Sequence, residues 1–236
     1  MKAEKILSII SKLELSRDEQ KKADFLKKQP DDELKYFFDP LVALELIRRE
    51  AEKEIRTEAA KASGDGEYLK AANRTFKLLK KSRRNTDLEH IYRDEDGRTV
   101  IPCSFYAVRL NCDISGLDVA EHREPMAFNF DNFLNETEQN YRAGFLDLPT
   151  LGDVRAFVKV RKFSDKGQDK YTFDFGDGLP AVNAEYMLDV LTLLTDEKRG
   201  IFPVAYYRDE TSIIYLESER GDAILCPIIK KESRTE

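Results

Sequence analysis

The chain has 236 residues, enough for one large domain or two small ones, with 36% charged and 41% hydrophobic side chains. Its net charge of −6 argues against a general nucleic-acid coat protein. An acidic protein can nevertheless carry basic side chains along one face, and the local potential decides whether DNA is contacted. Charges in residues 1–13 interrupt any secretory signal, and no apolar stretch reaches the roughly 18 residues of a membrane span. The three cysteines form no close-spaced framework, so we expect a reduced, cytoplasmic setting.

The first 63 residues are predicted to be helical. Ser16 and Glu19 form a capping-box pair that opens one helix. Asp39-Pro40 supplies a cap and a first-turn proline for a longer helix. The glycines of Ser63–Gly66 end that helix, and we place a domain boundary there.

We therefore expect two parts, an all-helical N-terminal segment over residues 1–63 and a domain over residues 67–231. In the domain a helix from Tyr68 to about Ser82 precedes strands, and a second helix capped by Asn183 precedes three more. This repeated order indicates an α+β class with an approximate internal duplication. The expected strands are 88–93, 99–110, 154–162, 170–175, 202–207, 213–217 and 223–229.

Three segments of this domain resemble bacterial beta-type DNA sliding clamps, the DNA polymerase processivity factors. The runs VNAEYMLDVLTLL (182–194) and DAILCPII (222–229) are similar to the closing half-domain of that family. TVIPCSFYAVRL (99–110) is similar to a clamp segment with a Thr-Asp-Gly-x-Arg-Leu-like core, although Phe105 intervenes where the family has Asp-Gly.

The resemblance implies a sliding-clamp-like domain of two half-domains, each a helix with an antiparallel sheet. It also implies a non-catalytic protein of replication or of a phage or mobile element, bound to duplex DNA and to a peptide of a replication protein. Family rings hold six such domains, so one domain per chain would require an oligomer of six. By position, the peptide pocket would involve Tyr186, Leu188, Cys226, Pro227 and Ile228. The alternative is that these are core residues of a strand and a helix.

The first helix of the domain carries a row of basic side chains, which we call the basic stripe. At about 100° per residue its members fall within roughly an 80° arc. Like charges at this spacing cost about 0.2–0.5 kcal/mol per pair, and DNA phosphate is a partner that relieves the cost without reading bases. The alternative is a solvated face paired with acids of the N-terminal helices. The stripe consists of Lys70, Arg74, Lys77, Lys81 and Arg84.

The second helix departs from this pattern, because it carries Glu185 and Asp189 and is followed by Asp196 and Glu197. A ring around DNA would favour basic residues there. The competing hypothesis is therefore a protein-interaction or regulatory module that keeps the clamp fold without binding DNA.

Enzymatic motifs are weak in this sequence. His90 and His122 accompany no nucleophile, and together with Cys103 and Cys112 they lack the spacing of a zinc site. We expect no catalytic residue, metal or cofactor.

Overall fold

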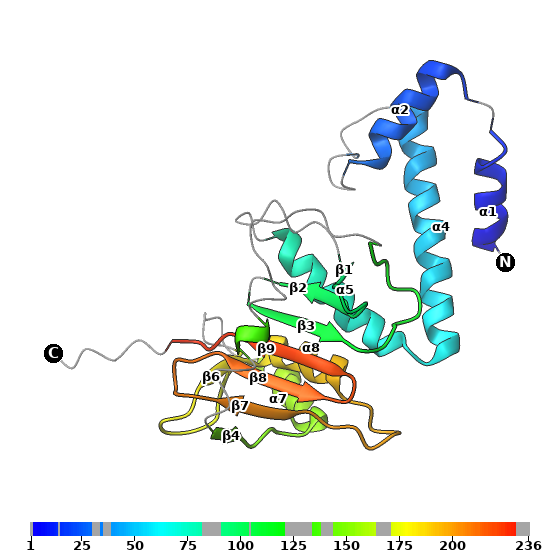
Figure 1. The fold of residues 1–236 in the computed structure, drawn as a ribbon. Coiled ribbons are helices and arrows are strands. Elements are labelled where there is room, and N and C mark those ends of the chain that lie inside the picture. The colour runs from blue at the N-terminus through cyan, green and yellow to red at the C-terminus, as the bar shows by residue number, and fades with distance from the viewer. Residues whose placement is uncertain are drawn as a thin grey trace. The chain divides into compact units, whose positions relative to one another are not determined.

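The computed structural model describes residues 2–13, 15–29, 34, 39–81, 91–103, 105–120, 134–137, 144–163 and 171–229. The chain divides into two compact units, residues 1–66 and 67–236 (Figure 1). The first unit contains the helices α1 (Lys2–Ile10), α2 (Arg17–Lys27) and α4 (Pro40–Ser63). The second combines helices with antiparallel sheet, which confirms the α+β class. Among the described helices, none has the length and apolarity needed to cross a bilayer.

Local capping determines where the helices of the first unit begin and end. Before α2, the Ser16 amide donates to Glu19 Oε2 at 2.8 Å and the Glu19 amide donates to Ser16 Oγ at 3.4 Å, so the predicted capping box is confirmed. Before α4, the Asp39 carboxylate accepts from the Leu41 amide at 2.9 Å. Gly64 ends α4 in the left-handed region at φ 87°, as the glycine signal predicted.

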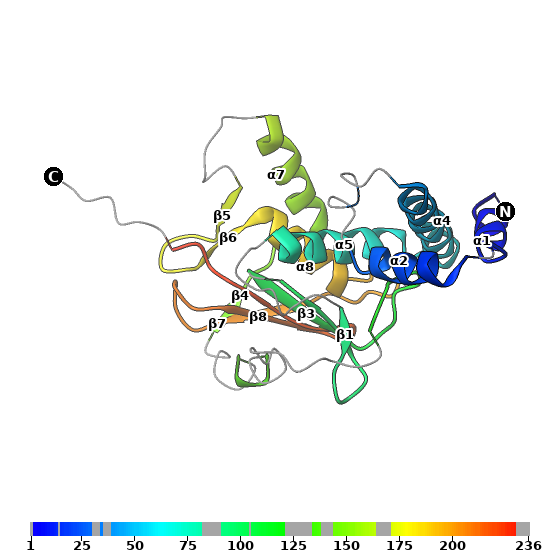
Figure 2. The same cartoon turned by 90° about the horizontal axis from the view of Figure 1, so that it is seen from above.

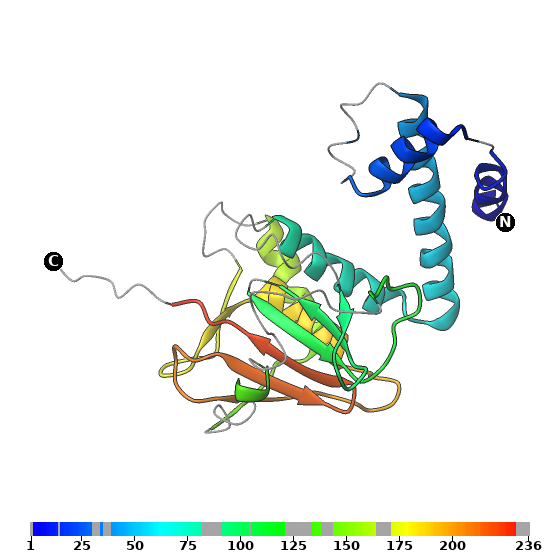
Figure 3. The same ribbon diagram turned by 45° about the horizontal axis from the view of Figure 1, so that its top comes forward.

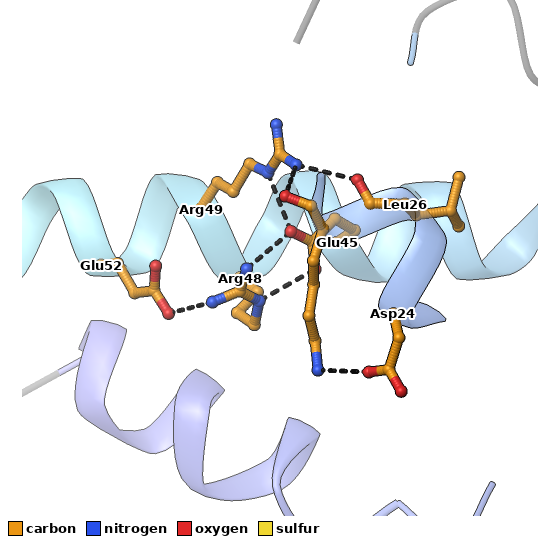
Figure 4. A network of polar contacts seen from close by, with 7 residues as sticks. Asp24, Leu26, Glu45, Arg48, Arg49 and Glu52 are labelled. Carbon is orange, nitrogen blue, oxygen red and sulfur yellow. Dashed lines mark hydrogen bonds and ion pairs between the residues drawn. The ribbon is translucent and has the colours of Figure 1, made fainter. Parts of the chain in front are cut away.

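A buried carboxylate ties α2 to α4 within the first unit (Figure 4). Glu45 accepts from Arg48 Nε at 2.9 Å and from Arg49 Nε at 2.8 Å. Arg49 also donates to the carbonyls of Leu26 and Lys27, both at 3.0 Å, at the C-terminal end of α2. Burial alone would raise the pKa of Glu45, but the two arginines lower it overall.

The second unit is built on a seven-stranded antiparallel sheet in the order β1-β2-β3-β9-β8-β7-β4. Its two longest pairings, β3 with β9 and β8 with β9, lie in the middle of the sheet. Strands β5 (Thr172–Asp174) and β6 (Ala181–Asn183) form a separate two-stranded sheet. The seven strands are β1 (Tyr92–Arg93), β2 (Thr99–Pro102), β3 (Tyr106–Leu110), β4 (Gly144–Leu146), β7 (Val204–Tyr207), β8 (Ile214–Ser218) and β9 (Gly221–Leu225).

Helices α5 (Gly66–Lys81) and α8 (Ala184–Leu194) cover one face of this sheet (Figure 2). The side chain of Asn183 caps α8 by accepting from the Glu185 amide at 2.9 Å, as predicted. Helix α8 packs on β3 and β9, and its face toward the sheet includes the buried side chains of Met187 and Leu191. The α5 face toward the core includes the buried side chain of Leu69.

One strand prediction was wrong, and another covers two strands. Residues 151–163 form helix α7 (Leu151–Phe163), because Val154, Phe157 and Val158 repeat at a helical period. The strand after it, β5, pairs with β6 instead of the 154–162 segment. The segment 99–110 is also not one strand, since it folds back on itself to form the antiparallel β2–β3 pair. Every side chain of β2 and β3 is buried, so alternation of buried and exposed positions does not separate the two strands.

A buried ion pair lies across the central β3–β9 pairing. Arg109 stands opposite Asp222 and donates to both of its carboxylate oxygens, at 2.8 and 2.6 Å. Arg109 Nη1 also donates to Asn135, and the Tyr215 hydroxyl donates to Asp222 Oδ2 at 3.3 Å. The guanidinium of Arg109, whose side chain is 2% exposed, therefore has acceptors on both sides.

Candidate functional site

The described part of the basic stripe lies on the exposed side of α5. Lys70 Nζ donates to Glu67 of the same helix at 2.8 Å. Lys77 is exposed and forms no ion pair with a described residue. The side chain of Lys81 and all of Arg84 lie outside the described residues.

Arg74, the middle member of the stripe, joins a polar network between α5, α8 and β3. Its Nε donates to Asp189 Oδ1 at 2.7 Å, and its Nη2 donates to the same oxygen. The Tyr106 hydroxyl donates to Asp189 Oδ2 at 3.2 Å and lies 3.0 Å from Thr75 Oγ1. Asp189 is 5% exposed while Arg74 is 51% exposed, so the carboxylate is inside and the guanidinium reaches solvent.

The pKa values in this network are shifted by burial and by its hydrogen bonds. Burial raises the pKa of Asp189, and hydrogen bonds from Arg74 and Tyr106 hold part of that rise back. Burial also raises the pKa of Tyr106, so its hydroxyl stays protonated and can donate. The acid that pairs with Arg74 therefore belongs to α8.

A second cluster gathers around Phe105, at the hairpin between β2 and β3. The ring of Phe105 stacks on Tyr186 of α8 with a centroid distance of 5.3 Å and an interplanar angle of 14°. Tyr186 also lies 5.4 Å from the Tyr106 ring. Because 47% of Phe105 is exposed, this aromatic stack forms part of the surface of the unit.

The C-terminal segment passes beside this cluster. The Cys226 amide donates to the Phe105 carbonyl at 2.9 Å, and the Ile228 amide donates to the Ala181 carbonyl at 2.7 Å. Tyr186 and Cys226 of the predicted pocket thus both contact Phe105, and Pro227 lies between the two bonded amides. Leu188 is two residues from Tyr186, about 200° around α8, so it does not share the Tyr186 face.

Burial shifts the pKa of both titratable side chains of this second cluster. Burial raises the pKa of the Cys226 thiol, with the neighbouring Cys103 adding to the rise. Burial likewise raises the pKa of Tyr186. Both groups therefore stay neutral near pH 7. Within the described part of the chain, no group of three or more His, Cys, Asp or Glu is arranged to hold a metal ion; His90 and His122 lie outside it.

Sequence reasoning missed a second basic helix face, on α7. Arg155, Lys159 and Lys162 are all exposed there. Their i, i+4, i+7 spacing equals that of Lys70, Arg74 and Lys77 on α5. That spacing was the available signal, and it was lost because the segment was interpreted as a strand.

Comparison of the chain with protein-family models, with curated proteins and with solved structures returns no match. Two surfaces of the second unit bear on function, the basic face of α5 and the aromatic cluster around Phe105.

Proposed function

We propose that this chain is a sliding-clamp-like, DNA-associated binding protein of replication or of a mobile element, with no reaction of its own. The observation that carries the proposal is the order of elements in the large sheet. Helix α5 precedes the meander β1-β2-β3, and helix α8 precedes the meander β7-β8-β9. The last strand of each meander pairs with the other, antiparallel, at the middle of the sheet.

This order supports two half-domains related by an approximate two-fold axis between β3 and β9. Each half-domain contributes a helix to the same face of the sheet (Figure 2). Of the segments that resemble sliding clamps, residues 99–110 span β2 and β3 of the first half, and residues 182–194 and 222–229 lie on α8 and on β9 with the segment after it.

The chemistry of DNA attachment rests on the exposed cations of α5. Lys70 and Lys77 lie on the solvent side of the helix, where phosphate contacts release counterions regardless of base sequence. The Lys70–Glu67 bond does not oppose this, because an exposed pair contributes only about 0–1 kcal/mol and exchanges easily for phosphate.

Fluorescence anisotropy with a labelled duplex at low and raised salt tests the proposal. The wild-type chain should bind at low salt and weaken steeply as salt rises. The variant Lys70→Glu/Lys77→Glu should lose binding while its circular dichroism stays unchanged. Arg74 is left intact in this variant, because it holds the buried Asp189. Lys198→Glu/Arg199→Glu, which changes two exposed cations of the turn after α8, is the matched control. A wild-type chain indifferent to DNA would refute the proposal.

Light scattering on the same sample tests the ring that the resemblance implies. An oligomer of about six chains with salt-dependent binding would support a working clamp. A smaller species that still binds DNA would support a one-sided attachment to the duplex.

The second candidate is a protein-interaction module without DNA binding. The stacked pair of Phe105 and Tyr186, next to the terminal segment, favours it. So does the neutralisation of Arg74 by Asp189. A folded monomer or dimer that ignores duplex DNA at low salt would select this candidate.

A further inference from the structure

Helix α7 presents one buried and one basic face. Val154 is fully buried, and Phe157 packs edge-on against Phe173 with 5.3 Å between ring centroids. Arg155 and Lys159 are exposed on another face and form no ion pair with a described residue. This helix therefore has an anchored side and a side that faces solvent with positive charge.

The basic face of α7 has the same geometry as that of α5. Residues at i, i+4 and i+7 fall within roughly a 60° arc and span about 10 Å of helix rise. Along one DNA strand a phosphate recurs about every 3.4 Å of the duplex axis, so a span of this length matches roughly three phosphates. Both helices thus offer a short row of cations on the scale of a phosphate backbone.

The two rows belong to one side of the sheet. Figures 2 and 3 show α5, α7 and α8 on the same side, and α7 packs against α8. Glu67 lies near the start of α5. Its pKa is lowered mainly by the hydrogen bond from Lys70, and the positive charge of Arg155 on α7 lowers it further. The start of the α7 row therefore lies within electrostatic reach of the start of the α5 row.

Charge is distributed unequally over these three helices. Helix α7 has four basic and one acidic side chains, a net charge of +3, and α5 has five basic and one acidic, a net of +4. Helix α8 has two acidic and no basic side chains, a net of −2. Asp189, one of these acids, is buried beneath Arg74. The positive charge of this layer thus lies on α5 and α7. Two similar half-domains would instead carry it on α5 and α8.

We propose that Arg155, Lys159 and Lys162 of α7 form, with the cations of α5, one surface that contacts the phosphates of duplex DNA. This inference rests on the proposed DNA association and adds to it a helix outside the two repeated units. It assigns α8 the role of supporting Arg74.

The salt dependence of binding measures how many phosphates the protein neutralises, and it tests the assignment. The variant Arg155→Gln/Lys159→Gln removes two charges while glutamine keeps a similar helix propensity. For duplex binding, the slope of log K against log salt should become shallower by about 1.8, or about 0.9 for each phosphate that is no longer neutralised. The charge-retaining variant Arg155→Lys/Lys159→Arg should keep the wild-type slope, since phosphate attraction depends on charge. Lys198→Gln/Arg199→Gln, which removes the same amount of charge, should also keep it.

The outcomes separate this inference from the proposed function. If Lys70→Gln/Lys77→Gln flattens the slope and the α7 variant does not, the assignment of α7 is overturned while DNA association stands. Equal flattening by the α7 variant and the Lys198/Arg199 control would reveal a net-charge effect and overturn it too. If the wild-type chain binds vesicles of anionic lipid but not duplex DNA, both proposals fail. Circular dichroism and thermal unfolding of every variant confirm that binding is compared between folded proteins.

Discussion

Asp189 of α8 accepts two hydrogen bonds from the guanidinium of Arg74 on α5, with 2.7 Å between Arg74 Nε and Asp189 Oδ1. The pair joins the two helices that cover the large sheet. It also makes Arg74 a structural residue as well as a member of the basic stripe. A test of DNA binding that replaces Arg74 would therefore mix a loss of charge with a loss of stability.

Removing either partner of this pair should have unequal effects. Arg74→Gln leaves a carboxylate that is 5% exposed without its cation, and we expect a loss of about 1–3 kcal/mol in the free energy of unfolding. Asp189→Asn leaves a guanidinium that is half in solvent, so we expect a loss below about 1 kcal/mol. Urea denaturation of both variants measures the difference. Equal losses would show that the pair contributes symmetrically and that burial of Asp189 is not the deciding factor.

The stability of the second unit should depend on pH through Asp189. Burial raises the pKa of this carboxyl in the folded state, so the folded chain holds the proton more tightly than the unfolded chain. The free energy of unfolding should then fall as pH rises from the ordinary carboxyl pKa through the folded one. Arg74→Gln removes a group that lowers this pKa. The free energy of unfolding of this variant should therefore fall further with rising pH, and the fall should extend to higher pH. Urea denaturation between about pH 4 and pH 8 compares wild type, Arg74→Gln and Asp189→Asn. The stability of Asp189→Asn should lack the pH dependence that the Asp189 carboxyl contributes.

The buried pair Arg109–Asp222 should be costly to break and cheaper to replace. Arg109→Met leaves Asp222 buried with one remaining donor, Tyr215, and we expect a loss of about 3–5 kcal/mol. The double variant Arg109→Met/Asp222→Leu removes the stranded charge and should recover part of that loss. Chemical denaturation of the single and double variants measures both values. A double variant less stable than Arg109→Met would show that the pair itself, rather than the unpaired charge, determines stability here.

Gly221 should tolerate no side chain. It begins β9 at φ 147°, and an added Cβ would lie 2.0 Å from the Arg109 carbonyl oxygen, which belongs to the backbone and cannot move aside. Gly221→Ala should therefore cost about 3 kcal/mol or more in the free energy of unfolding. Gly200→Ala is the matched control, because Gly200 also has a positive φ, 69°, but open space around it. Its cost should be limited to about 1–2 kcal/mol of backbone strain. Thermal unfolding of the two variants compares them, and similar midpoints would contradict the steric argument.

Local signals predicted much of the helical structure. The capping residues Ser16, Asp39 and Asn183 lie where α2, α4 and α8 begin, because a cap bonds amides within the next three residues. The glycines after residue 63 also lie where α4 ends. Helix α7 was missed although its apolar residues repeat at a helical period, since residues 154–162 were interpreted as a strand paired with residues 170–175.

The candidate sites were less predictable. Spacing alone revealed the cations of α5, but it could not reveal that one of them is committed to Asp189, 115 residues away. The resemblance placed Tyr186 and Cys226 in one pocket, but the contact of both with Phe105 was hidden, because the β2–β3 hairpin lies far from α8 and from the C-terminal segment in the sequence.

The amino-acid sequence by itself determined the helix starts, the stop at Gly64 and the spacing of the basic side chains. These depend on contacts within about four residues, whose geometry follows from the backbone. Only the tertiary structure decided which cations are paired, that β3 meets β9, and that α7 adds its charge to the helical side of the sheet. These depend on side chains brought together by packing, which local patterns do not encode.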